Sequence, residues 1–345
     1  MPTIFDLVTS SNTVAYYDEN MRNRQPYIGE TLFPDEQQLG LRLEWIKGAQ
    51  GLPVVLKNSA FDTNVIPRGR KGFDVLSTKM PYFKESMYVD EELRQQLNIL
   101  LQTGNQSMID MVMNRIFKDT TTLLDAARAA REMMRMSLVT TGVLSLSSNG
   151  QAYSYDFGIP SANKITVTNK WSTPASSTPM KDLREAMDLV EDATGVRPTR
   201  AIMSRKTWYE LLASDEIKKS IYVFTNGVGT ISDERLKAYL IDQLDLSVEV
   251  VTKKYISTTG TSTPYVPDGI VSLLPSGTLG NTWFGTTPEE SDLMGVPGAD
   301  TSITDTGVAV TAMRSFDPVN VETKVSMICL PSFEQADKVA ILSVD

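Results

Sequence analysis

Residues 107–138 read SMIDMVMNRIFKDTTTLLDAARAAREMMRMSL, a stretch that no proline or glycine interrupts. Its apolar side chains recur at steps of three and four residues, which is the spacing of one face of an α-helix. At ~1.5 Å per residue, the stretch predicts a helix about 48 Å long, longer than most globular domains need. The apolar positions hold no clean heptad register, and three threonines at 120–122 cross the middle. A single spine helix is therefore favoured over a coiled coil.

The residues after this helix predict a β-hairpin and then a second helix. Strand-like segments at 142–146 and 151–157 flank the sequence SSNG at 147–150, whose Asn-Gly pair is a strong turn signal. A linker rich in Ser, Thr and Pro follows at 172–179. It leads to a helix from Met180 to Thr194, with Pro179 in the first turn and Gly195 at the end.

From residue 199 onward, helices and strands first alternate, and strands then dominate. We expect helices at 206–213 and 232–244, the second capped by Ser232. The expected strands are 199–204, 247–252, 270–274, 278–284, 307–316, 320–330 and 338–344. This mixture predicts an α+β fold, with strand-rich ends around an α/β middle.

The residues before the spine helix predict an arm and a long hairpin. The chain up to about Gly40 shows little sustained period and is typical of an extended arm. Residues 43–87 alternate as strands do, around a polar tip with the sequence PRGRKG at 67–72. From Lys57 to Lys84 the cations Lys57, Arg68, Arg70, Lys71, Lys79 and Lys84 outnumber Asp62 and Asp74, which leaves a local net charge of +4. A basic hairpin on an acidic protein indicates a specific electrostatic partner.

The composition excludes much catalytic chemistry. The chain has 345 residues, with 33 Lys and Arg against 42 Asp and Glu, for a net charge of −9. It has no histidine and one cysteine, Cys329. Ser-His-Asp and Cys-His catalysis and His-ligated zinc are therefore excluded. An internal disulfide and a thiolate cluster are excluded as well, and we expect no metal and no cofactor.

Hydropathy and net charge also bear on the cellular location of the protein and on whether it binds nucleic acid. The N-terminal sequence MPTIFDLV has no basic segment, and no window approaches the ~18 apolar residues of a membrane span. We therefore expect a cytoplasmic protein with no membrane partner. The negative net charge argues against free DNA as a tightly bound partner, because the electrostatic term would be repulsive overall.

Two segments are candidate sites. Residues 286–306 contain no Lys or Arg and five acids, Glu289, Glu290, Asp292, Asp300 and Asp305. This segment is either a solvated loop or the partner of the basic hairpin tip on another copy. The sequence Asn226-Gly227-Val228-Gly229-Thr230 precedes a helix and could cradle a phosphate. It lacks a following Gly-Lys-Ser/Thr and a third glycine, so a flexible loop is favoured.

Paired carboxylates such as Asp233 and Glu234, or Glu289 and Glu290, could bind Mg²⁺, yet surface solvation explains them equally well. The arm, the basic hairpin and the overlong helix would bury little of their own surface in a monomer. They are explained when neighbouring copies cover them. The residues therefore favour a self-assembling protein over an α/β enzyme with decorations.

In this order of elements the chain resembles the major capsid proteins of tailed bacteriophages, in particular the lambda-type major head protein family. The stretches that carry the resemblance are RAIMSRKTWYELL at 200–212, VPDG at 266–269 with LGNT at 279–282, and MICLPSFEQADKV at 327–339. Each motif is diffuse, and the succession of elements covers essentially the whole chain.

The resemblance implies the Hong Kong 97-type capsid fold. Its expected parts are an N-terminal arm (1–42), an E-loop hairpin (43–87), a P domain with the spine helix 107–138 (88–175), an A domain (176–318) and a C-terminal return to the P domain (319–345). It also implies assembly from pentamers and hexamers into an icosahedral shell around double-stranded DNA. The DNA would be enclosed without sequence-specific binding, and the virion would be built in the bacterial cytoplasm. A portal protein and a scaffolding protein are further expected partners, with a decoration protein as another.

No long charged pro-segment precedes the arm in this sequence, so we expect a separate scaffolding protein. We expect Arg68, Arg70 and Lys71 to meet acidic groups of an adjacent copy. Lys57 and Lys79 join these cations, and the candidate acids are Glu289, Glu290 and Asp292. The loop with Asn226, Gly227 and Gly229 is expected near the five- and six-fold axes.

The sequence leaves two alternative functions open. An encapsulin-like nanocompartment shell would have the same fold. A soluble α/β enzyme could bind a phosphorylated metabolite through Gly227 and Gly229.

Overall fold

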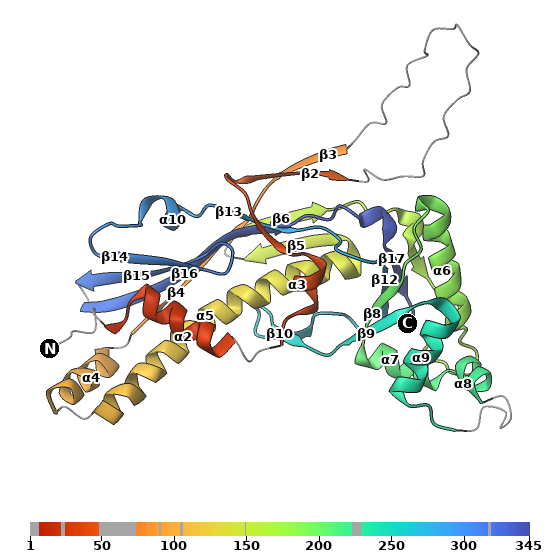
Figure 1. The fold of residues 1–345 in the computed structure, drawn as a ribbon, viewed down its shortest axis with the longest axis horizontal. Helices are drawn as coiled ribbons and strands as arrows, with labels where there is room; N and C mark the ends of the chain where they lie inside the picture. Colours follow the sequence, from red (N-terminus) through yellow and green to blue (C-terminus); the bar gives the residue numbers. More distant parts are fainter. Residues whose placement is uncertain are drawn as a thin grey trace, which may run out of the picture. The chain divides into compact units, whose positions relative to one another are not determined.

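The expected spine helix is present as α5 (Gln106–Thr141), a helix of 36 residues (Figure 1). The structure is a computed structural model that describes residues 7–21, 25–47, 74–89, 91–103, 106–148, 150–222, 229–316 and 319–345. The described residues belong to two compact units. One unit is formed from residues 1–43, 77–134 and 281–332, and the other from 44–76, 135–280 and 333–345.

The first unit is built around β16 (Val319–Pro331), the 13-residue strand expected at 320–330. One edge of β16 pairs antiparallel with β15 (Val308–Phe316), and β15 pairs with β14 (Ala299–Thr304). Strand β16 also pairs antiparallel with β4 (Tyr82–Tyr88) and, at its C-terminal end, with β13 (Thr282–Gly285), which lies parallel to β1 (Asp35–Gln37). The result is a six-stranded sheet in which the longest strand is central.

Helix α5 packs in this unit with α4 (Glu91–Thr103) through an apolar stripe. The buried members of the core include Leu97, Ile109, Met113, Ile116 and Val321. These α5 residues follow the three- and four-residue steps seen in the sequence, so the periodicity identified the buried face correctly.

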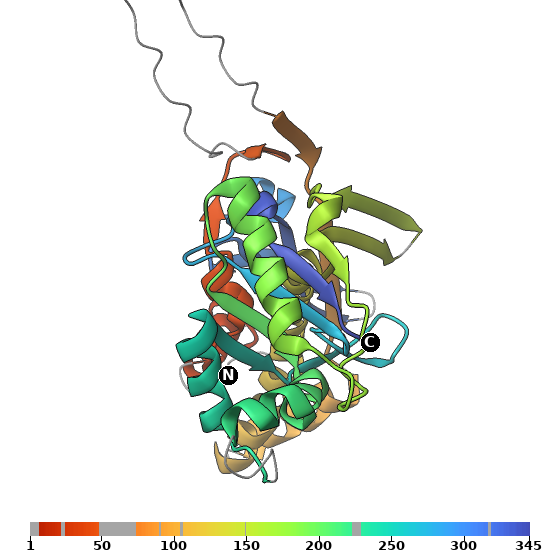
Figure 2. The same cartoon turned by 90° about the vertical axis from the view of Figure 1, so that its right-hand side faces the viewer.

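The second unit is an α/β structure around a five-stranded sheet. The strand order is β7 (Lys164–Thr166), β17 (Ala340–Ser343), β12 (Ile270–Leu274), β8 (Arg200–Ser204) and β9 (Ser247–Val251). Its helices are α6 (Pro179–Thr194), α7 (Arg205–Ala213), α8 (Asp215–Ile221) and α9 (Asp233–Leu244). Trp171, Leu183, Trp208 and Leu240 are among the side chains that fill the core, and α6 lies in front of the strands in Figure 2.

The helix ends of this unit match the sequence signals. Gly195 ends α6 in the left-handed conformation, at φ 74°, where a side chain would be strained. Ser204 and Ser232 cap α7 and α9, and each hydroxyl accepts a hydrogen bond from the backbone N–H three residues later. The expected elements at 180–194, 199–204, 206–213, 232–244, 247–252 and 270–274 are therefore confirmed to within one residue at each end.

Three further pairs of strands complete the described structure. The expected hairpin after the spine is formed by β5 (Val143–Ser148) and β6 (Gln151–Asp156). Strands β10 (Lys254–Ile256) and β11 (Ser262–Pro264) form a second hairpin. Strands β2 (Arg42–Lys47) and β3 (Asp74–Lys79) pair at the base of the expected E-loop. Residues 48–73, which contain its tip, lie outside the described residues.

The N-terminal segment differs from the expected extended arm. It contains a 12-residue helix, α2 (Ser10–Met21), and a short helix, α3 (Ile28–Leu32). Helix α2 has only a weak apolar stripe, since Ser10, Thr13 and Tyr17 are its buried residues. Polar contacts to β14 replace that stripe, and such long-range contacts leave no periodic signal in the local sequence.

The acidic segment 286–306 also contains regular structure. It forms α10 (Pro288–Asp292), capped by Thr287, and the whole of β14. Strand β14 pairs with β15 over six residues, which fixes the positions of Asp300 and Asp305. The segment is therefore part of the sheet rather than a loop throughout.

Candidate functional site

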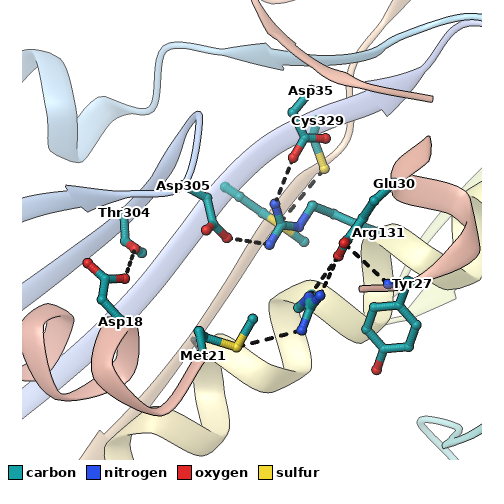
Figure 3. Close-up of polar contacts among 11 residues, drawn as sticks. Asp18, Met21, Tyr27, Glu30, Asp35, Arg131, Thr304, Asp305 and Cys329 are labelled. Atoms are coloured by element: carbon teal, nitrogen blue, oxygen red, sulfur yellow. Dashed lines mark hydrogen bonds and ion pairs between the residues drawn. The ribbon is translucent and has the colours of Figure 1, made fainter. Parts of the chain in front are cut away.

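The C-terminal half of the spine helix buries charged side chains within its apolar stripe. Arg128, Arg131 and Glu132 are each less than a tenth exposed. Burying a charge is unfavourable unless partners replace the lost water. The contacts of these three residues show which parts of the first unit supply the partners, and Figure 3 shows the carboxylates around Arg131.

Arg131 joins α5 to two carboxylates that are distant in the sequence. Its guanidinium contacts Asp305 at 2.6 Å and Asp35 at 3.4 Å, and it lies 5.5 Å from the ring centroid of Phe284. Burial by itself would lower the pKa of Arg131, but the two carboxylates outweigh that effect, and the pKa is raised. Arg131 is therefore a charged residue that holds β1 and the turn after β14 against the helix.

Arg128 makes the corresponding link to α3. Its Nε donates to Glu30 Oε1 at 2.8 Å, and one terminal nitrogen lies 2.7 Å from the same oxygen. The guanidinium also lies 4.8 Å from the ring centroid of Tyr27 and donates to the sulfur of Met21 at 3.6 Å. A planar guanidinium suits this combination of a carboxylate and an aromatic face.

Glu132 adds a third contact to the same segment. Its Oε1 accepts a hydrogen bond from the backbone N–H of Gly29 at 3.1 Å, next to the fully buried Leu32 and Phe33. Three charged side chains of one helix thus hold residues 27–35 in place. We interpret this arrangement as a structural anchor for the N-terminal segment, since every described partner lies within the same unit.

Helix α2 is fastened to β14 by a separate set of polar contacts. The backbone N–H and the hydroxyl of Ser10 both donate to Asp300 Oδ2 at 2.8 Å, and the hydroxyl also contacts the Ser302 hydroxyl at 2.7 Å. Thr304 donates to Asp18 at 3.4 Å. Burial raises the pKa of the nearby Tyr17 hydroxyl to about 12, so this group is neutral at physiological pH.

A second buried ion pair lies at the start of β4, where the chain leaves the expected E-loop. Glu289 Oε1 is 2.7 Å from Lys324 Nζ and accepts a hydrogen bond from the Tyr82 hydroxyl at 2.6 Å. Burial alone would raise the pKa of Glu289, but these two donors outweigh it and lower the pKa to about 2. The carboxylate therefore stays ionised and connects α10, β4 and β16.

The five acids of 286–306 consequently have different roles. Glu289, Asp300 and Asp305 are occupied by Lys324, Ser10 and Arg131 within the same subunit. Asp292 is exposed, and Glu290 is half-buried, with a long contact of 3.5 Å from Gln37 Nε2 to its carboxylate. The acidic surface that could meet another copy is thus narrower than the composition indicates.

The basic partners expected for that surface are only partly described. Lys79 is exposed at the end of β3, whereas Lys57, Arg68, Arg70 and Lys71 lie outside the described residues. Asn226 and Gly227 also lie outside them, and Gly229 is exposed at their boundary. The pairing of these cations with the acids of 286–306 therefore stays a prediction.

The loop that contains Gly229 has a well-fixed base. The Tyr222 hydroxyl donates to the backbone carbonyl of Thr230 at 2.8 Å. The guanidinium of Arg235, in the first turn of α9, lies 4.6 Å from the centroid of the Tyr222 ring. These contacts join Tyr222 to Thr230 and to the first turn of α9.

Three features of the described part of the chain bear on metal binding, membranes and the single cysteine. Among these residues, no group of three or more Asp, Glu or Cys side chains is placed to hold a metal ion. None of the helices there is both long enough and apolar enough to cross a membrane. Cys329, the one cysteine of the chain, is a buried thiol.

The buried charges of α5 were missed in the sequence, although a signal was present. Arg128, Arg131 and Glu132 follow Leu124 and Ala127 at the same three- and four-residue steps as the apolar side chains. A charged residue in register with a buried stripe indicates a partner elsewhere in the chain. The identity of that partner depends on tertiary structure.

Comparison with known proteins gives one family. A family model described as "Phage major capsid protein E" matches residues 10–344. No curated protein matches the sequence.

Several solved structures resemble the chain over nearly its whole length. A prophage protein of E. coli CFT073, described as a capsid protein, is 14% identical with a TM-score of 0.59, and the match covers 98% of this chain and 99% of that one. A phage-related protein from Bordetella bronchiseptica RB50 is 16% identical with a TM-score of 0.55, and the match covers 97% of each chain. The capsid of cyanophage A-1(L) is 11% identical with a TM-score of 0.51, over 92% of this chain and 91% of that one. At these identities the likeness shows a shared fold.

Proposed function

Because this chain belongs to the phage major capsid protein E family, we propose that it builds an icosahedral phage head from pentamers and hexamers of itself. It is a shell-forming capsid protein with the Hong Kong 97-type fold, and its place is the virion. The family match over residues 10–344 is the observation that carries this conclusion. Of the three functions that the sequence left open, the phage head is the one that the family supports.

The contents and partners of the head are part of the proposal. The shell would enclose double-stranded DNA, and the net charge of −9 supports a wall that does not grip packaged phosphates. Assembly would take place in the cytoplasm of the bacterial host, with a portal protein at one vertex and a separate scaffolding protein. A decoration protein could bind the outside. The chain would act as a structural protein, with no catalytic step.

Expression of the chain with its scaffolding partner tests the proposal. We expect megadalton particles by sedimentation and closed shells in electron micrographs. A chain that stays monomeric under all conditions would contradict it. An encapsulin-like compartment would instead give closed shells that load a protein cargo and never associate with a portal.

We further propose that the basic hairpin tip meets an acidic surface on an adjacent copy. Arg68, Arg70 and Lys71 supply the positive charge. Glu290 and Asp292 are the acids of α10 that remain available, since Glu289 is already paired with Lys324. Such complementary charges set register between copies more than they add affinity.

A double charge reversal tests this contact. Arg70→Glu combined with Lys71→Glu should leave a folded subunit and lower the yield of particles at least tenfold at physiological salt. Lys253→Glu combined with Lys254→Glu makes the same change of charge on exposed residues at the start of the β10–β11 hairpin and should assemble normally. Equal yields from the two variants would reject the contact and leave the shell function intact.

We also propose that residues 223–229 lie near the five- and six-fold axes. The anchoring of this segment by Tyr222 and Arg235 supports a role that requires a fixed base and a variable tip. Crosslinks between copies at Asn226 within isolated pentamers or hexamers would test it.

A further inference from the structure

The hairpin of β5 and β6 forms a two-stranded sheet by itself. In the described part of the chain, no other strand pairs with either of its edges. Figure 1 shows the two strands as a separate pair beside the end of the spine helix. Isolated two-stranded hairpins are marginally stable in water, and a third or fourth strand is the usual remedy.

The register shows which backbone groups face outward. Phe157 donates its N–H to the carbonyl of Gly142 at 3.1 Å, and the pairs Leu144–Tyr155 and Leu146–Tyr153 follow two residues apart along the ladder. Hydrogen-bonded and non-hydrogen-bonded pairs alternate in antiparallel strands. The N–H and C=O groups of residues 152, 154 and 156 on β6 therefore point away from β5, as do those of 143, 145 and 147 on β5.

The two edges are protected to different extents. At the start of β5, the Thr141 hydroxyl accepts a hydrogen bond from the outward N–H of Val143 at 3.1 Å and donates to the Val143 carbonyl at 2.9 Å. On β6, Ala152 and Ser154 are exposed, and among the described residues no side chain bonds to their outward groups. Ser145 and Ser147 of β5 are exposed too, but Thr141 covers the start of that edge, so the edge of β6 is the more open of the two.

The edge of β6 also lacks the sequence features that keep edge strands from pairing with other chains. Natural edge strands usually carry charged residues, prolines or bulges. From Gly142 to Tyr155 the sequence has no charged residue and no proline, in a chain with 22% charged residues. A charge appears only at Asp156, the last residue of β6.

The two faces of the hairpin suit the addition of further strands. Leu144, Leu146, Tyr153 and Tyr155 share one face, on which the two tyrosine rings stack 6.1 Å apart. On the opposite face, the central pairs are the small residues Ser145–Ser154 and Ser147–Ala152, and Val143 pairs with Asp156 at the end of the hairpin. A longer sheet would continue the aromatic face without placing bulky groups on the other.

We propose that β6 pairs antiparallel with β6 of a second copy across a two-fold axis, with Ser154 opposite Ser154. This inference rests on the proposed shell function, which supplies copies of the chain at high local density. The pairing joins two hairpins into a four-stranded sheet with an isologous interface. Asp156 then lies opposite Ala152, so that no like charges meet, and Tyr155 lies opposite the partner's Tyr153.

Cysteine crosslinking in assembled particles tests this geometry. Two residues of a hydrogen-bonded antiparallel pair have Cα atoms about 5.5 Å apart, which is within disulfide range. Ser154→Cys should therefore give a covalent dimer on mild oxidation. Background is low because the native Cys329 is buried.

Ser145→Cys is the matched control. Ser145 is also exposed and lies directly across from Ser154 on the same face of the hairpin. In the proposed sheet, the two copies of Ser145 are three strand spacings apart, about 14 Å, which is too far for a disulfide. A dimer from Ser154→Cys alone supports the pairing, and a dimer from both variants or from neither overturns it.

A second pair of variants tests whether the edge contributes to assembly. Ser154→Pro removes the outward N–H, and Ser154→Val keeps it while changing the side chain by a similar volume. We expect a particle yield at least tenfold lower for the proline variant, with the valine variant near the native yield. Equal yields from both variants would overturn the inference. Particles without crosslinks would reject this interface alone, whereas absence of particles from the native chain would reject the shell function itself.

Discussion

Glu289 carries a negative charge that its own subunit already neutralises. Its carboxylate lies between Lys324 and Tyr82, and its side chain is only 5% exposed. Removing one partner of a buried pair costs more than the pair itself contributes, because the remaining charge is left without compensation. At the residue scale, such pairs therefore decide which charges remain available for neighbours.

The substitution Glu289→Gln should lower the free energy of unfolding of the soluble subunit by about 3 kcal/mol, because Lys324 would lose its counter-ion in a mostly buried position. Urea unfolding of the isolated subunit measures the change. Glu290→Gln alters the adjacent, less buried carboxylate and should stay within about 0.5 kcal/mol of the native protein. A loss of stability from Glu290→Gln as large as that from Glu289→Gln would contradict the assignment.

The ion pair of Glu289 and Lys324 should make the free energy of unfolding depend on pH. The pKa of Glu289 is about 2 in the folded chain, against 4.5 for the ordinary group. A lowered pKa contributes stability that is fully present above the unfolded value and is lost as the pH falls toward the folded one. The difference in unfolding free energy between native protein and Glu289→Gln should therefore be constant above about pH 5 and shrink between pH 4.5 and pH 2. Urea unfolding at a series of pH values measures this difference. A difference that does not change between pH 4.5 and pH 2 would show that the Glu289 carboxylate is not paired.

Substitution of Arg131 should lower the free energy of unfolding at least as much as substitution of Glu289. Arg131→Met leaves Asp35 and Asp305 without their cation, and we expect a loss of about 3 kcal/mol in unfolding free energy. Arg131→Lys keeps the charge but cannot span both carboxylates with a rigid fork, so about half of that loss should remain. Full recovery with lysine would show that charge alone, and not the guanidinium geometry, holds the N-terminal segment.

At the scale of elements, α2 shows how a helix can depend on contacts outside itself. Its buried residues are mostly polar, and its attachment to β14 depends on Ser10, Asp300 and Ser302. A helix of 12 residues with so few apolar contacts has little stability of its own. Its formation therefore depends on the strand beneath it.

The substitution Asp300→Ala tests this dependence, because it removes the acceptor of two hydrogen bonds from Ser10. We expect amide hydrogen exchange in residues 10–21 to become about tenfold faster, with little change in the five-stranded sheet of the other unit. Asp292→Ala removes an exposed acid from α10 and should leave the exchange of α2 unchanged. Uniform acceleration across the whole chain would instead indicate global destabilisation.

At the scale of the whole molecule, the distribution of charge matters more than its total. The chain carries −9 overall, while the segment from Lys57 to Lys84 is positive and α10 is negative. Two of the five acids in 286–306, Glu289 and Asp305, pair with cations of the same subunit, and Asp300 is hydrogen-bonded to Ser10, so the remaining acidic surface is small and specific. Contacts between such surfaces set the register of copies and respond to ionic strength.

A charge swap tests the proposed contact between copies. Glu290→Lys with Asp292→Lys should lower particle yield on its own, and so should Arg70→Glu with Lys71→Glu. The four substitutions together should restore at least half of the native yield, because the attraction is re-established with opposite signs. Yields are read from sedimentation profiles at physiological salt. If the combined variant assembles no better than either parent, the two surfaces do not meet.

Much of this molecule followed from local patterns. The three- and four-residue steps of 107–138 predicted α5 and its buried face, because a helix places such residues on one side regardless of what covers them. Gly195, Ser204 and Ser232 marked helix ends, since capping is satisfied within a few residues of the same chain. The alternation near 320–330 predicted β16 for the same reason.

Only the tertiary structure decided the roles of the charged residues and of the N-terminal segment. Asp305 meets Arg131 across 174 residues, and Ser10 meets Asp300 across 290, separations over which the sequence has no repeating pattern. For α5, α6, α7, α9 and β16, the sequence by itself determined the element, because its pattern and its end signals follow from backbone geometry. Which acids are neutralised, whether residues 10–21 form a helix, and which strand edge stays open depend on what the folded chain places beside them.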